Sequence, residues 1–339
     1  MKFIKGYIKL NKIIYSCLNI ISIFISEIAE IVEENVSSMI ISEVSLVYAD
    51  KQTINQAESI TWHMLREGRL TGSRVHDVLH TDQVHPAPSL IKRICGKSSV
   101  MKTSVPSLRW GIDHEKDAIA DFMDYQISQS HESPAISKSG LVIKQDYPFL
   151  AASPDGLYIC NCHSKALLQV NCHYTLKDTQ SVEEAIESGT FYLDKDCFLK
   201  KSHRYYTQVQ HQLYVCDYEK CHFIVWTPQW MQITLIDRDD DFIQSNLPKL
   251  INFFKVHVMP ELLTRRIEDK DKRKEIEKGK LYCFCNSPYT VNDEETWIGC
   301  DTVDCPKEWY HLTCVGIKRV PKGNWYCKLC KKAKKQKNK

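Results

Sequence analysis

Seven cysteines and one histidine near the C-terminal end have the spacing of metal ligands. They are Cys283, Cys285, Cys300, Cys305, His311, Cys314, Cys327 and Cys330. Thiolates and imidazole are ligands that zinc prefers, and a structural zinc site takes four of them in a tetrahedron. The eight ligands therefore predict two zinc ions, which would replace the hydrophobic core that so small a segment lacks.

The order of these ligands separates the classes of zinc finger. Histidine is the fifth ligand here, whereas a RING finger has histidine fourth. With the stretches YCFCN, WIGCD, CPKEWYH and PKGNWYC, this order resembles a PHD finger of the inhibitor-of-growth proteins, which read trimethyl-lysine near the start of histone H-three. The resemblance implies interleaved sites, with Cys283, Cys285, His311 and Cys314 on one zinc and Cys300, Cys305, Cys327 and Cys330 on the other.

The same resemblance implies a methylated histone tail as partner, held by an aromatic cage. The cage positions are Tyr282, Trp297 and Trp309. Aromatic faces attract a quaternary ammonium, which has no hydrogen-bond donor left. Asp301 would pair with an arginine of the tail, the tail would add as a strand beside Thr296–Cys300, and Glu294 and Glu295 would favour a basic peptide. The alternative is that these aromatic residues pack the small core, as we expect of Trp325.

Four stretches in the middle of the chain carry a second resemblance. They are WHMLREGRLTGSRVHDVL (62–79), RWGIDHEKDAIADF (109–122), LAASPDGL (150–157) and YYTQVQHQLYV (205–215). Each is a weak signal alone, but in this order they resemble the phage lambda exonuclease and YqaJ viral-recombinase family. The resemblance implies an α/β fold, a restriction-endonuclease-like PD-(D/E)xK core with flanking helices, joined here to the small zinc-stabilised finger.

Two catalytic positions of that family are altered in this sequence. Hydrolysis of a phosphodiester uses Mg²⁺ held by carboxylates, and the family adds a lysine near the attacking water. Carried over, Glu115 and Asp155 are two of the carboxylates, but Gln169 and Asn171 replace the glutamate and the lysine. Losing a group that stabilises charge in the transition state costs about 10²–10³ in rate. We therefore expect an inactive nuclease fold with weakened Mg²⁺ binding.

Two alternatives to this hypothesis stay open. The domain could be an active Mg²⁺-dependent DNA exonuclease or recombinase of mobile-element origin, in which Lys177 or Lys165 replaces the missing lysine or Mn²⁺ supports slow turnover. The domain could also be purely structural, in which case charge reversal at Arg66 would leave DNA binding unchanged. The Gln169 and Asn171 replacements favour a chromatin-associated binding protein over both.

Other family positions are intact and imply contact with double-stranded DNA ends. Arg66, Ser73 and Ser153 match residues that hold the 5′-phosphate of a DNA end, and Gln208 and Gln210 match glutamines near the attacking water. The alternatives are a solvated Arg66, a helix-capping Ser73 and glutamines on an exposed helix face. A fold that keeps its phosphate contacts while losing its metal would bind DNA without cutting it, in a salt-dependent way.

A short cysteine-rich stretch, Cys160-Asn161-Cys162-His163, follows the SPDG turn. It raises the prospect of a third metal site, which would need another ligand, and Cys172 or His173 across the strand pair could serve. The alternative is a loop with free thiols.

Composition limits the class of protein but not its partners. The 339 residues hold 45 Lys and Arg against 42 Asp and Glu, a net charge of +3, and Lys331–Lys339 carries a local basic excess. Clustering among the 15 cysteines favours zinc in a reducing compartment, and with the histone reader implied above we expect the nucleus. The apolar run Ile13–Ile25 mimics a signal peptide but is too short for a membrane span, so we expect no membrane contact. Nothing in the sequence fixes an oligomeric state.

The motifs must be positioned by a predicted order of elements. We expect a helix, a glycine-containing turn and a helix over 62–80, a helix over 109–125, strands over 140–151 and 166–172, a helix over 205–215, a strand over 221–227 and helical spacing over 242–263. The predicted organisation is an extension (1–48), the nuclease-fold domain (49–263), a charged linker (264–281), the finger (282–331) and a basic tail (332–339).

Overall fold

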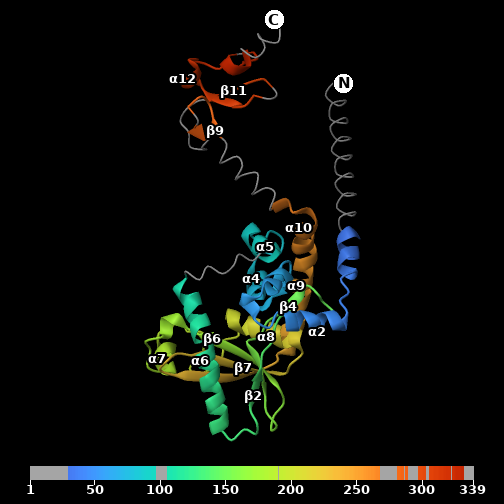
Figure 1. The fold of residues 1–339 in the computed structure, drawn as a ribbon, viewed down its shortest axis with the longest axis vertical. Helices are drawn as coiled ribbons and strands as arrows, with labels where there is room; N and C mark the ends of the chain where they lie inside the picture. Colours follow the sequence, from blue (N-terminus) through green and yellow to red (C-terminus); the bar gives the residue numbers. More distant parts are fainter. Residues whose placement is uncertain are drawn as a thin grey trace, which may run out of the picture. The chain divides into compact units, whose positions relative to one another are not determined.

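The structure is a computed structural model, shown in Figure 1, and it divides into two units, Met1–Arg265 and Arg266–Lys339. It describes residues 30–96, 105–189, 191–267, 281–285, 287–288, 297–302, 305–321 and 323–331. The apolar run at 13–25, most of the charged linker and the basic tail lie outside these residues. Within the described ranges, no helix combines the length and the apolar composition that crossing a bilayer requires.

A five-stranded mixed sheet forms the centre of the first unit. Its order is β2 (Ala135–Ser137), β5 (Gly156–Ile159), β6 (Ala166–Cys172), β7 (Lys220–Trp226) and β8 (Met231–Asp237). Only β6 and β7 run parallel, with Gln169 opposite Phe223. A second sheet has the order β1 (Leu70–Thr71), β4 (Leu150–Ala152) and β3 (Val142–Ile143). The predicted strand at 166–172 is confirmed, whereas 140–151 forms two short strands joined by a turn.

Two long helices cover opposite faces of β6 and β7. Along each strand, successive side chains alternate between the two faces. Leu168 and Ile224 pack against Phe122 of α6 (Pro106–Ser128), which lies across the sheet in Figure 1. Leu167 and Phe223 pack in a separate cluster with residues of α8 (Arg204–Cys216). The indole N–H of Trp226 also donates to Asp121 of α6 at 2.6 Å, which anchors this helix to β7.

Further helices surround the two sheets. They are α2 (Glu43–Gln52), η1 (Gln56–Glu58), α3 (Ile60–Arg66), α4 (Gly72–His80), α5 (Pro88–Cys95), η2 (Tyr174–Leu176), α7 (Val182–Glu187), α9 (Asp240–Phe253) and α10 (Met259–Thr264). The predicted helical segment at 242–263 is α9 and α10 joined by a π-helical turn, Phe254–Val258. The expected α/β class is therefore present, with helices on both sides of a mixed sheet.

Helix α2 begins before the predicted domain boundary at residue 48. Ala49 packs among Leu141, Ile143 and Ala151, so this helix belongs to the core of the first unit. The backbone N–H of Gly140 donates to Asp50 at 2.7 Å, and a β-carbon at Gly140 would lie only 2.1 Å from the Asp50 carbonyl oxygen. Only glycine permits so close an approach of the helix.

The second unit is small and contains two strand pairs. They are β9 (Leu281–Tyr282) with β10 (Ser287–Pro288), and β11 (Trp297–Gly299) with β12 (Trp309–His311), followed by α12 (Leu312–Val315). Among the described residues of this unit, the buried ones are Ile298, Tyr310, His311, Leu312 and four of the cysteines. So few apolar residues make a metal-dependent fold the physical expectation.

Candidate functional site

The eight predicted zinc ligands form two separate clusters in the finger. One contains Cys283, Cys285, His311 and Cys314, and the other contains Cys300, Cys305, Cys327 and Cys330. Within each cluster all ligand atoms lie within 4.8 Å of one another, as they do around one tetrahedral ion. The sets are Cys₃His and Cys₄, both of which suit zinc. The interleaved arrangement expected from the sequence is therefore the one that the chain adopts.

The three predicted cage residues come from three strands of the finger, β9, β11 and β12. The register of β11 and β12 pairs Trp297 with His311 and Gly299 with Trp309, so the two tryptophans are diagonal neighbours on one face. Trp309 is 49% exposed, and its ring lies over Gly299, where a β-carbon would be 3.4 Å away. The Tyr282 ring stands at 81° to that of Trp297 at 6.3 Å. Three aromatic faces thus border one region of the finger.

Packing also occupies part of this aromatic surface. Trp297 contacts the His311 ring at 3.7 Å, so it supports a zinc ligand as well as lining the surface. Trp325 packs against buried Tyr310 at 5.4 Å, in the structural role expected for it. Asp301 is exposed, and its carboxylate accepts a hydrogen bond from the Trp325 backbone N–H at 2.6 Å. That bond fixes the carboxylate at the edge of the finger. Glu294, Glu295 and Thr296 lie outside the described residues.

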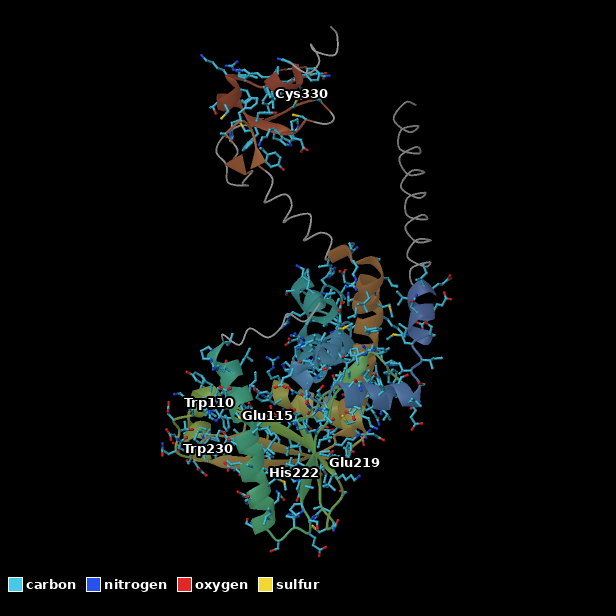
Figure 2. The ribbon with its side chains drawn as sticks, in the orientation of Figure 1. Trp110, Glu115, Glu219, His222, Trp230 and Cys330 are labelled. Carbon is cyan, nitrogen blue, oxygen red and sulfur yellow. The ribbon has the colours of Figure 1, made fainter. Side chains whose placement is uncertain are left out.

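In the first unit, two carboxylates approach each other between α6 and the central sheet. Asp155 lies in the turn before β5, and Glu115 projects from α6 (Figure 2). Burial, and after it repulsion from Glu115, raises the pKa of Asp155 to about 8, although hydrogen bonds from Val170 and Gln169 oppose this. Desolvation also raises the pKa of Glu115, against the attraction of Lys138 and Lys116. A cation between Asp155 and Glu115 would therefore stabilise the charged forms of both carboxyl groups.

The side chain of Gln169 partly stabilises the carboxylate of Asp155. Its amide N–H donates to a carboxylate oxygen of Asp155 at 2.5 Å, and the Val170 backbone N–H donates to the same oxygen at 2.6 Å. A glutamate here would put a second negative charge at that distance, which a metal ion or a proton would have to bridge. The glutamine thus replaces a charge repulsion with a hydrogen bond.

Asn171 lies two residues further along β6, on the same face as Gln169. Its amide donates to the hydroxyl of Tyr192 at 2.6 Å. Tyr192 is 4% exposed, and burial is the main reason that its pKa is raised well above the ordinary value. Because both partners are neutral, this position of β6 holds no cation, whereas the resemblance stated from the sequence implies a lysine there.

The glutamines of α8 differ from the sequence expectation. Gln208 donates to the Gln169 side-chain oxygen at 3.2 Å, as its placement near the site requires. The structure does not bring Gln210 there, because its amide bonds instead to the backbones of Asp237 and Asp239. Gln212, which the sequence analysis missed, donates to the same Gln169 oxygen at 2.7 Å. Residues four apart share one helix face, so this periodicity was the available signal.

The three predicted phosphate contacts are joined through Trp62. The Arg66 guanidinium stacks on the Trp62 ring at 3.9 Å and donates to Ser73 at 3.3 Å, and the Trp62 indole N–H donates to Ser153 at 2.9 Å. Ser73 is the second residue of α4, whose N-cap is Thr71, so the capping alternative does not apply. Burial, and then repulsion by Arg74, lowers the pKa of Arg66 to about 10. Across the described ranges, no carboxylate forms an ion pair with this guanidinium.

Gln212 and the chain segment from Ser153 to Asp155 connect the phosphate-contact residues to the carboxylate pair. Gln212, which bonds to Gln169, also donates to the Ser153 backbone carbonyl at 3.4 Å. Ser153 is separated from Asp155 by one residue. A ligand held by Arg66, Ser73 and Ser153 would therefore extend toward the carboxylates.

The two lysines proposed as substitutes flank β6 at opposite ends. Lys177 pairs with Asp178 at 3.4 Å, and Lys165 precedes β6 at the end opposite Asn171. Lys138, which the sequence analysis missed, follows β2 and lowers the pKa of Glu115. Of the two lysines that lower the pKa of Glu115, Lys138 has the larger effect.

The raised pKa of Asp155 gives a testable dependence of stability on pH. The folded chain holds this proton more tightly than the unfolded chain, so the free energy of unfolding decreases as the pH rises from the ordinary pKa of 3.8 to about 8. We expect Asp155→Asn to reduce this decrease, since one amide oxygen can accept both hydrogen bonds. Urea unfolding of both proteins across that range, without divalent metal, measures it. An equal decrease in both would contradict the assignment.

Comparisons with known proteins find relatives for two parts of the chain. Residues 61–219 match the model of the YqaJ-like viral recombinase domain. A short segment is 52% identical over 52 residues to the transcriptional regulatory protein PHO23 of Saccharomyces cerevisiae, covering 15% of this chain and 14% of that protein. Inhibitor of growth protein 3 of Homo sapiens is 49% identical over 55 residues, covering 16% of this chain and 12% of that protein. This chain thus spans only a small part of those relatives.

Among solved structures, an alkaline exonuclease from Laribacter hongkongensis has a similar arrangement. It is 22% identical, with a TM-score of 0.42, and the match covers 63% of this chain and 97% of that one. The family-model match and the matches to PHO23 and inhibitor of growth protein 3 bear out both resemblances expected from the sequence. The chain joins a YqaJ-like domain, at residues 61–219, to a zinc-finger segment similar to those of the inhibitor-of-growth and PHO23 proteins.

Proposed function

We propose that this chain is a chromatin-associated nuclear protein that reads trimethyl-lysine on a histone H-three tail and holds DNA ends without cutting them. The observation that carries the proposal is the hydrogen bond from Gln169 to Asp155, because an amide donor occupies the place of a metal-binding carboxylate. The nuclear location and the histone partner rest on the similarity of the finger to chromatin-regulating relatives.

The finger would bind two zinc ions and use its aromatic surface as the cage. Trp309 offers an exposed face, and the rings of Tyr282 and Trp297 stand nearly perpendicular to each other. A trimethylated ammonium between such faces gains cation–π attraction without losing hydrogen bonds. The exposed edge of Asp301 would pair with an arginine of the same peptide.

The YqaJ-like domain would still bind phosphate but would lack the groups that catalyse hydrolysis. Arg66 is a half-buried cation held by Trp62 and Ser73, and it lies close to the N-terminus of α4, where backbone N–H groups also favour an anion. A 5′-phosphate would supply the negative charge that the described surroundings of Arg66 lack. Magnesium binding would be weak, because Gln169 brings no charge and already bonds to Asp155.

Charge reversal at Arg66 tests the DNA-binding part of the proposal. We expect Arg66→Glu to weaken binding of 5′-phosphorylated duplex DNA by about tenfold or more, since a charged hydrogen-bond partner is lost. The slope of log affinity against log salt should fall by about one. Fluorescence anisotropy over a range of salt concentrations measures both quantities.

Lys249→Glu is the matched control, because this lysine is exposed on α9 and contacts only Asn246 among the interactions described for it. It changes the net charge equally and should alter binding much less. Equal loss in both variants would show a general charge effect, and no loss in Arg66→Glu would favour the purely structural alternative.

A second candidate function is an active metal-dependent nuclease. Lys138 favours it, because this cation lies close enough to Glu115 to lower the pKa of that carboxyl. If Lys138 assists the attacking water, the natural chain digests DNA with Mg²⁺ or Mn²⁺, and Lys138→Met removes that activity.

A further inference from the structure

A third cluster of metal-binding side chains lies in the first unit, away from the carboxylate pair. It contains His131, Cys160, Cys162 and His163, whose ligand atoms all lie within 4.8 Å of one another. Cys160, Cys162 and His163 belong to the turn between β5 and β6. His131 lies beyond the C-terminal end of α6, 29 residues earlier in the sequence, so no short motif reveals it.

The distances within this cluster are those of a tetrahedral zinc site. With zinc–sulfur bonds of about 2.3 Å and zinc–nitrogen bonds of about 2.0–2.1 Å, neighbouring ligand atoms lie about 3.3–3.8 Å apart. The Nδ1 atoms of His131 and His163 are 3.3 and 3.2 Å from the sulfur of Cys162. The sulfur of Cys160 is 3.5 Å from that of Cys162 and 3.7 Å from Nδ1 of His163.

The finger provides an internal comparison. There, the Cys285 and Cys314 sulfurs lie 3.4 and 3.7 Å from Nδ1 of His311, and the Cys305 and Cys327 sulfurs are 3.8 Å apart. The third cluster is therefore as compact as the two clusters whose spacing the sequence already assigns to zinc. Four side chains with two sulfurs and two nitrogens converge on one point.

The backbone places these ligands independently of any ion. The Asn161 N–H donates to the Glu132 carbonyl at 2.9 Å, which ties the β5–β6 turn to the segment after α6. Ser130 adopts a positive φ of 62°, so the chain turns sharply before His131. The His131 and His163 rings approach to 5.0 Å at an angle of 52°. Two segments that are distant in sequence, the one after α6 and the β5–β6 turn, therefore hold the four side chains close together.

We propose that His131, Cys160, Cys162 and His163 bind a structural zinc ion that joins the end of α6 to the β5–β6 turn. The site takes zinc because its donors are two thiolates and two imidazoles, and it is structural because four protein ligands leave no open position for substrate. Its consequence is mechanical. α6 carries Glu115, Asp155 immediately precedes β5, and Gln169 lies on β6, so the ion joins α6 to the hairpin that positions the other two side chains.

The further ligand is His131 and not Cys172 or His173, the two residues considered from the sequence. Cys172 and His173 lie at the far end of β6, because Ala166 at its start pairs with Tyr158, next to the turn. His131 takes the place proposed for them.

Metal content of the full chain tests the proposal. The protein is purified with zinc in the medium, dialysed against metal-free buffer and measured by plasma mass spectrometry. The three clusters predict three zinc ions per chain for the natural protein and two for the variant with Cys160→Ser and Cys162→Ser. Cys172→Ser is the matched control and should retain three. Two ions in the natural protein, or three in the double variant, would overturn the proposal.

A second measurement covers the case in which the double variant does not fold. Titration of the natural, metal-free protein with Co²⁺, followed by its tetrahedral d–d absorption, should saturate at three equivalents. His131→Ala changes one partly exposed side chain and should reduce this to two with an unchanged circular dichroism spectrum. Saturation at two equivalents in both proteins would exclude the third site, whatever the behaviour of the cysteine variant.

Discussion

The double variant with Gln169→Glu and Asn171→Lys is expected to digest linear duplex DNA in the presence of Mg²⁺. The glutamate would add a third carboxylate beside Asp155 and Glu115, where the amide of Gln169 now forms a hydrogen bond. The lysine would bring a cation where Asn171 now bonds to Tyr192. Because a transition-state charge stabiliser contributes about 10²–10³ in rate, we expect a gain of at least that size over the natural chain.

The same variant has a second readout that does not depend on turnover. A glutamate within reach of Asp155 is repelled unless a cation bridges them, so Mg²⁺ should raise the melting temperature of the variant more than that of the natural chain. Gln208 and Gln212 can still donate to the glutamate, which keeps the local frame. Adding Asp155→Ala should abolish the acquired digestion. Activity that survives this third change would mean that the reaction occurs elsewhere.

Trp309→Ala is expected to abolish selective binding of a trimethyl-lysine peptide from the start of histone H-three. The ring is 49% exposed and stands over Gly299, so its removal takes away a cage face without opening the buried core. A cation–π contact in a desolvated site contributes about 2 kcal/mol or more, which corresponds to about a 30-fold loss of affinity. Isothermal titration with methylated and unmethylated peptides measures this loss.

Two controls separate the loss of the cage from damage to the finger. Zinc content of the Trp309→Ala variant should be unchanged, because Trp309 is not a ligand in either finger cluster. Trp309→Phe keeps an aromatic face and should retain part of the preference for the methylated peptide. Equal affinity of the natural chain for both peptides would remove the cage assignment altogether.

Motifs with fixed spacing could be recognised from the sequence because their chemistry constrains the distances between residues. The finger ligands follow such spacing, and their two clusters form as expected. The strand over 166–172 was predictable from its apolar residues Ala166, Leu167, Leu168 and Val170, and register then fixed the positions of Gln169 and Asn171. The amide of Gln169 bonding to Asp155 was not predictable, since it depends on the distance between two elements.

The missed residues depend on contacts between distant segments. His131 joins the third cluster only because α6 ends beside the β5–β6 turn. Lys138 affects Glu115 because β2 pairs with β5 at the edge of the sheet. Gln212 differs from these, because helix periodicity from Gln208 could have found it. The position of α2 depended on the tight approach at Gly140, which composition does not reveal.

A nuclease assay with the natural chain and 5′-phosphorylated linear duplex DNA distinguishes a DNA-binding protein from an active enzyme. The DNA is incubated with Mg²⁺ or Mn²⁺, and binding and digestion are followed in the same samples, with Asp155→Ala in parallel. We predict salt-sensitive binding by both proteins and digestion by neither. If the natural chain digests the DNA and Asp155→Ala stops this digestion, the proposal of binding without cutting is wrong. A residue such as Lys138 would then have taken over the role of the missing lysine.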